Sequence, residues 1–162
     1  MASILIYLVL IASVGAGLNA GLFFIFSVCI MAALARLPVP DGIAAMNAIN
    51  EVIQSPLFFI VFLGTAVVAL AVIVIAFLQG TPGSGLAMAA ALVFLVGTIG
   101  VTIVVNVPMN DALAAAGPAS AEAAALWGGY LATWTAWNHV RTATSLASLV
   151  LFVLAYGRMA GA

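Results

Sequence analysis

The sequence predicts an all-α fold: an integral membrane four-helix bundle with short interfacial helices in the first and third loops. Of the 162 residues, 67% are hydrophobic and only 4% are charged, whereas about a quarter of the residues in an ordinary soluble domain are charged. The apolar residues fall into four runs long enough to cross ~30 Å of hydrocarbon, for which a helix needs about 20 residues. Helices satisfy their own backbone hydrogen bonds in lipid, so each run is predicted to be helical.

The four spans are predicted to form one membrane domain, residues 1–162. They cover approximately residues 3–34, 56–78, 86–105 and 137–156. The segment "RLPVPDG" ends the first span, because two prolines and a glycine stop a helix, and "QGTPGSG" forms a tight turn between the second and third spans. Short connections favour an up-down bundle with both termini on one side.

Two loop segments are predicted to be helices that lie at the membrane interface. The first is Ile43–Ser55, whose apolar residues recur at helical spacing: Ile43, Met46, Ile49 and Ile53. In the third loop, Asn106–Ser120 is predicted to leave the membrane, and the Ala-rich segment 121–134 then forms a second interfacial helix.

Composition also limits the partners and the location. The net charge of −1 provides no basic patch for nucleic acid, so the lipid bilayer is the expected partner, and a homo-oligomer stays open. The single cysteine, Cys29, lies in an apolar run and is predicted to be a small buried residue. A signal peptide is disfavoured because the first apolar run has no basic start and continues too far. We expect a multi-pass protein of a bacterial inner membrane.

Polar side chains gather at one end of the predicted bundle. The turn between the second and third spans offers only uncharged groups, whereas the opposite end holds all four acids and the one histidine. We call this opposite end the polar end. Its polar residues are Arg36, Asp41, Asn47, Asn50, Glu51, Asn106, Asn110, Asp111, Glu122, Asn138, His139 and Arg141.

Helical phase predicts a cavity at the polar end. On the fourth helix six residues, each three or four positions from another of the set, are predicted to share one face: Trp134, Trp137, Asn138, Arg141, Ser145 and Ser148. Thr98, Thr102 and Asn106 do the same on the third span. Within a membrane such stripes face protein or a water-filled cavity. We therefore predict a cavity between the third and fourth spans, closed by Asn19 and Glu51.

Structural explanations for several of these residues stay open. An interfacial aromatic belt would account for Trp127, Tyr130, Trp134 and Trp137. Thr98 and Thr102 would equally well hydrogen-bond one helix to another. Asn110 would equally well form part of a turn or a helix cap. Arg141 is harder to explain in this way, because it is expected to lie one turn inside the interface.

Four segments resemble the anthrone oxygenase-like family of small four-span membrane proteins. They are "NVPMNDALAA", "LWGGYLATWTAWNHVRTATSLAS" and, in the first half, "GLFFIFSVCIMAALARLP" and "MNAINEVIQSPLFFIVFLG". The resemblance covers nearly the whole chain. It implies oxidation of the activated methylene of an anthrone-type polycyclic aromatic by molecular oxygen, which is a monooxygenase activity. Its characteristic positions are Asn106, Pro108, Asn110, Trp137, Asn138 and Arg141.

This chemistry assigns expected roles to the polar end. His139, Arg141 and Asn138 are the candidate catalytic residues: the imidazole as a base, and the others, with Asn106, as donors to an enolate oxygen. The remaining candidate substrate-binding residues are Asn110, Trp134, Trp137 and Glu51. His139 lies two positions from both Trp137 and Arg141 and so points about 160° away from each. An alternative place for it, against another helix or the interface, stays open.

No cofactor is predicted, and three alternatives remain. One histidine and no cysteine cluster make neither a zinc nor an iron–sulfur site, but a His-plus-carboxylate metal site or a haem stays open. In place of oxygenation of a lipophilic aromatic substrate, the bundle would be a small-solute carrier or channel, or a non-catalytic binding or assembly subunit. The absence of a polar stripe near the Gln79–Gly85 turn argues against a channel.

Overall fold

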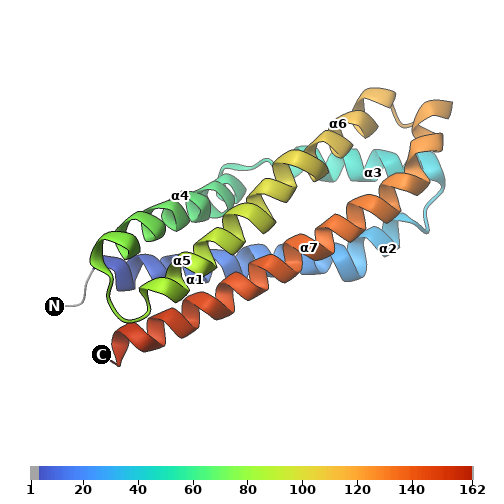
Figure 1. The fold of residues 1–162 in the computed structure, drawn as a ribbon. Helices are drawn as coiled ribbons and strands as arrows, with labels where there is room; N and C mark the ends of the chain where they lie inside the picture. Colours follow the sequence, from blue (N-terminus) through green and yellow to red (C-terminus); the bar gives the residue numbers. More distant parts are fainter. Residues whose placement is uncertain (1–3, 162) are drawn as a thin grey trace.

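The computed structural model describes residues 4–161, nearly all of them in helices, which confirms the all-α four-helix bundle (Figure 1). The elements are α1 (Ile4–Ile25), the π-helical turn η1 (Phe26–Ile30), α2 (Met31–Leu34), α3 (Val39–Val52), α4 (Pro56–Gln79), α5 (Ser84–Phe94), the π-helical turns η2 (Leu95–Gly100) and η3 (Thr102–Asn106), α6 (Val107–Ala116) and α7 (Ala121–Ala160).

Four continuous helices are long and apolar enough to cross a membrane: Ile4–Leu34, Pro56–Gln79, Ser84–Ala116 and Ala121–Ala160. Large apolar side chains are exposed along the outside of all four, which is the surface expected to face lipid. By length and composition the chain is a multi-pass membrane protein. The third and fourth helices have 33 and 40 residues and exceed the ~30 Å hydrocarbon thickness, so they extend beyond it.

The third and fourth helices extend well beyond the predicted spans. The third helix continues past Asn106 to Ala116, because Pro108 falls in the first turn of α6, after a π-helical turn, where a proline is tolerated. The segment 121–134 is the first part of α7 and not a separate interfacial helix. Ser120 caps α7 by accepting a hydrogen bond from the Ala123 amide (2.9 Å), and the Ala-rich sequence favours helix without interruption.

Both ends of the described chain lie at one end of the bundle, together with the α4–α5 turn (Figure 1). Gly80 and Gly83 form this turn with positive φ angles of 57° and 89°, which favour glycine. At the opposite, polar end lie α3, α6 and the first turns of α7. The short helix predicted in the first loop is present as α3.

The core consists of two apolar clusters with a layer of buried polar residues between them. Small residues, mainly alanine, dominate the cluster near the described chain ends, where Phe94 and Phe152 are the largest members. Large side chains such as Met46 and Trp127 fill the cluster at the polar end. The buried polar residues on α5–η3 and α7 are Thr98, Asn106, Asn138, Arg141, Ser145 and Ser148. The candidate site lies in this layer.

Two predictions of burial are wrong. The buried stripe of α7 runs through Trp134, Asn138 and Arg141, whereas Trp137 lies off it with 40% of its surface exposed. Asn138 is the next residue after Trp137 and points about 100° away from it, so the two cannot share a narrow buried face. Cys29 is exposed as well, because it lies on the outward face of the first helix.

Candidate functional site

A cavity of about 380 Å³ lies in the polar half of the bundle, a volume in the range of small-molecule sites. It is lined from α1, α3, α4, the η3–α6 segment and α7. Its lining combines the aromatic residues Phe23, Phe26, Phe58, Phe59, Phe62 and Trp134 with the polar residues Asn47, Asn50, Glu51, Gln54, Thr102, Asn106, Asn110, Asp111 and Arg141. The cavity therefore offers aromatic walls and a few polar groups.

Arg141 is the cation of this cavity and is 95% buried (5% exposed). Its two terminal nitrogens donate hydrogen bonds to neutral oxygens, Asn138 Oδ1 at 2.8 Å and Thr102 Oγ1 at 3.3 Å. The guanidinium carbon lies 4.4 Å from the Phe23 ring centroid and 5.0 Å from that of Trp134. These contacts fix the plane of the group, and neither of its hydrogen-bond acceptors carries a charge; the carboxylates of the lining, Glu51 and Asp111, are both exposed.

Three buried polar atoms of the lining have no hydrogen-bond partner among the described residues. They are Nε of Arg141, a donor, and Oδ1 of Asn106 and Oδ1 of Asn47, two acceptors. Asn106 is only 1% exposed, and its amide nitrogen donates to the Trp134 carbonyl at 3.3 Å. Because buried polar groups normally have partners, Nε of Arg141 is left among residues 4–161 as a free donor of the lining, and the two amide oxygens are left as free acceptors.

Asn138 lies behind Arg141 and does not line the cavity. Its amide nitrogen donates to the Phe23 carbonyl and to Ser27 Oγ, both at 2.7 Å, and its Oδ1 accepts from Arg141. Both of its N–H groups are thus already used. Asn138 positions Arg141 and joins α7 to the first helix, and the predicted donation to a ligand is not supported.

Asn110 joins three helices over the cavity. Its Oδ1 accepts from Tyr130 Oη at 2.7 Å and from Trp134 Nε1 at 2.8 Å, and its amide nitrogen donates to Asn50 Oδ1 at 3.2 Å. The rings of Tyr130 and Trp134 stack with centroids 6.1 Å apart. Trp127, Tyr130 and Trp134 are buried, so these three do not form an interfacial aromatic belt.

Replacing Asn110 by leucine is expected to lower the free energy of unfolding by about 2–6 kcal/mol, because Tyr130 Oη and Trp134 Nε1 would both be left buried without an acceptor at about 1–3 kcal/mol each. Denaturant unfolding in detergent micelles measures this change. Asn47→Leu is the matched control, since Asn47 lines the same cavity and its Oδ1 has no partner among the described residues. Equal losses in the two variants would contradict the assignment of Asn110.

Two π-helical turns, η1 and η3, lie next to the cavity and to Arg141. Ser27 belongs to η1, and Thr102 and Asn106 belong to η3, so both turns supply partners or lining to the Arg141 region. Such turns occur frequently at functional sites. Thr98 has the structural role predicted as an alternative, a hydrogen bond between helices. Its hydroxyl hydrogen-bonds to Ser145 Oγ at 2.8 Å and joins the third helix to α7.

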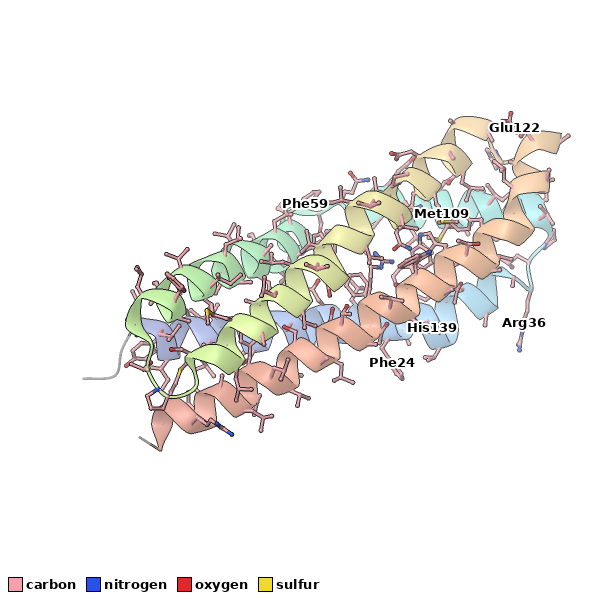
Figure 2. All side chains as sticks on the ribbon, viewed as in Figure 1. Phe24, Arg36, Phe59, Met109, Glu122 and His139 are labelled. Atoms are coloured by element: carbon pink, nitrogen blue, oxygen red, sulfur yellow. The ribbon has the colours of Figure 1, made fainter. Side chains whose placement is uncertain are left out.

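The structure brings most, but not all, of the predicted site residues together. Those that line the cavity are Glu51, Asn106, Asn110, Trp134 and Arg141. Trp137 and His139 are both exposed and do not line it. His139 lies beside a shallow groove on the other side of the bundle, opposite Phe59 (Figure 2). Asn19, predicted to close the cavity, bonds the Gly15 carbonyl in its own helix instead.

The phenylalanine walls of the cavity carry no signal in the sequence. Phe23, Phe58 and Phe62 line the cavity, but each lies in a long apolar run where a core or lipid-facing position would look the same. Residues 4–161 contain no group of three or more His, Cys, Asp or Glu side chains that could hold a metal ion, so the open metal alternative has no such ligand set there.

The fold defines a four-span membrane protein, and its cavity has aromatic walls, a buried arginine and two carboxylates in its lining. Residues 57–151 match the anthrone oxygenase family. The match covers more than half of the chain and includes Asn106, Asn110, Asn138 and Arg141, and the chain belongs to this family. No curated protein and no solved structure matches the chain.

Proposed function

We propose that the cavity binds a lipophilic aromatic ketone as its enolate and lets it react with molecular oxygen without a cofactor. The observation that carries the proposal is the buried Arg141, whose free Nε lines an aromatic-walled cavity and whose hydrogen bonds are all to neutral groups. Family membership supports an anthrone-type substrate.

Arg141 stabilises the reactive form of the substrate. An anthrone loses a proton from its methylene carbon, and the negative charge spreads through the rings to the carbonyl oxygen. A fixed guanidinium stabilises this charge because its donors are held in place before the charge develops. The rings of Phe23 and Trp134, which hold the guanidinium, also offer flat surfaces to a polycyclic substrate.

The reaction balances with oxygen as the only oxidant. The carbanion carbon forms a C–O bond with O₂, the resulting peroxide anion takes up a proton, and the hydroperoxide loses water to leave a second carbonyl. One oxygen atom enters the product and the other leaves as water, so anthrone and O₂ give anthraquinone and H₂O. No external reductant is consumed.

The proton acceptor in this scheme is a carboxylate of the cavity lining and not His139. Glu51 and Asp111 line the cavity, whereas His139 lies outside it. We expect His139→Gln to keep the wild-type rate and pH–rate profile, and the double variant Glu51→Gln/Asp111→Asn to lose about a hundredfold in kcat, the usual range for a general base. A large loss in His139→Gln alone, with the carboxylate variant unaffected, would reverse the assignment.

The apolar cluster near the described chain ends argues against the alternative of a solute channel. Its members include Leu5, Val72, Phe94 and Phe152, which are fully buried, and they fill that half of the bundle mainly with apolar side chains. The cavity and the polar groups that line it lie in the other half of the bundle, at the polar end. An enzyme that admits and releases its ligand at one side needs no polar path through the bundle.

Turnover of anthrone by the purified protein tests the proposal. The protein is placed in lipid nanodiscs, treated with a chelator and supplied with anthrone in air, and anthraquinone is measured by chromatography. We expect formation well above the rate in empty nanodiscs, and no loss on chelation. A rate equal to that in empty nanodiscs would overturn the proposed function.

A further inference from the structure

A series of phenylalanine rings connects the surface of α4 to Arg141. The rings of Phe59 and Phe58 lie 5.6 Å apart, those of Phe58 and Phe62 stack at 5.2 Å, and those of Phe62 and Phe23 meet edge to face at 6.4 Å. Phe23 in turn lies against the Arg141 guanidinium. All four rings line the cavity, so the series is a continuous aromatic wall along it.

Burial increases along this series from the outside inward. Phe59 is 41% exposed, whereas Phe62 is 5% and Phe23 is 4% exposed. The outer end of the series is therefore open to the surroundings of the bundle, and its inner end is enclosed at Arg141.

The outer end lies between α4 and the η3–α6 segment. Leu63 on α4 and Val107 on α6 both line the cavity while 47% and 42% of their surfaces stay exposed. We call these two residues the apolar lips. Asp111, one helical turn beyond Val107, is exposed and lines the cavity on the polar side of the same opening.

The arrangement of the helices produces this opening. α4 packs along α1 and α5, but this packing is not sustained along η3 and α6. Figure 1 shows α3 and α6 continuing past the first turn of α4, so α4 covers only part of the length of the third helix. A side entrance remains where α4 begins.

We infer that the aromatic ligand enters the cavity sideways from the bilayer, between the lips Leu63 and Val107, and follows the phenylalanine series inward to Arg141. This route rests on the proposed function for the nature of the ligand. A lipophilic polycyclic molecule concentrates in the bilayer because its apolar surface leaves water. Stacking on successive rings replaces part of its contact with lipid at each step.

Binding kinetics of anthraquinone, an unreactive probe, test the route. Quenching of tryptophan fluorescence in nanodiscs follows its arrival, since Trp134 lines the cavity, and substitutions by tyrosine add no tryptophan. The lip variant, Leu63→Tyr/Val107→Tyr, places larger side chains at both apolar lips and so narrows the opening between them. Leu70→Tyr/Val104→Tyr is the matched control, because these residues are exposed on the same two helices but do not line the cavity. Asp111→Tyr narrows the same opening on its polar side.

We expect the lip variant to slow association and dissociation each about tenfold, with Kd changed less than about threefold, because the barrier rises while the bound contacts remain. The control variant should behave as the wild type. Unchanged rates in the lip variant, or slowing by Asp111→Tyr alone, would overturn the bilayer route while leaving the proposed function standing. Failure of anthraquinone to bind the wild type would overturn the proposed function, and the route with it.

Discussion

Replacing Arg141 by methionine is expected to lower kcat for anthrone oxidation about a thousandfold, the scale found when a fixed oxyanion donor is removed from an enzyme. Methionine keeps an unbranched apolar side chain against Phe23 and Trp134 but removes the charge that stabilises the enolate. Arg141→Lys should recover little activity, because an ammonium group lacks the planar set of donors that meets Asn138 and Thr102 while leaving Nε for the ligand.

Turnover by the purified variants in nanodiscs measures this effect. Arg158→Met is the control, since Arg158 lies on the same helix but is exposed near its end, and it should keep the wild-type rate. Activity within about threefold of the wild type in Arg141→Met would show that the charge at this position does not take part in the transition state.

Replacing Asn138 by leucine is expected to lower kcat about a hundredfold and the free energy of unfolding by about 2–6 kcal/mol. The substitution leaves the Phe23 carbonyl without its buried donor and removes the acceptor that orients Arg141; each unpaired buried group costs about 1–3 kcal/mol. Thermal and denaturant unfolding, together with turnover, measure the two effects.

A double variant separates positioning from general loss of structure. If Asn138 acts through Arg141, Asn138→Leu should lower kcat little further in an Arg141→Met background, because coupled residues are not additive. Ser148→Ala is the control for stability alone, since Ser148 is fully buried on the same stripe and donates to the Ala90 carbonyl far from the cavity. Independent, multiplicative losses in the double variant would contradict the positioning role.

The sequence predicts the bundle well because membrane solvation acts through composition. Four long apolar runs need four helices. A charged side chain in lipid costs considerable free energy, so the sequence predicts that Arg141 faces a cavity. The helix ends were less predictable. Pro108 is usually read as a helix breaker, but the π-helical turn η3 before it lets the helix continue to Ala116.

Helical phase identified the polar residues of the site more reliably than the aromatic ones. Asn106 and Arg141 were placed correctly, whereas Trp137 deviates by about 60° from Trp134 on an ideal helix, enough to leave the narrow face that α7 buries against its neighbours. The phenylalanines of the wall carry no such signal, because Phe58 and Phe62 on α4 lie among apolar residues on all sides. Only packing distinguishes the cavity-facing rings from those facing lipid.

The absorption spectrum of bound anthrone without oxygen tests the central claim most directly, since it reports ionisation of the ligand when no product can form. The protein is loaded with anthrone anaerobically in nanodiscs, and the band of the deprotonated form is recorded for the wild type, Arg141→Met and Arg158→Met. We expect the anion to form in stoichiometric amounts in the wild type and in Arg158→Met, and to be absent in Arg141→Met. Bound anthrone that stays neutral in the wild type, or an anion that forms equally in Arg141→Met, would contradict the claim that the buried guanidinium stabilises the enolate.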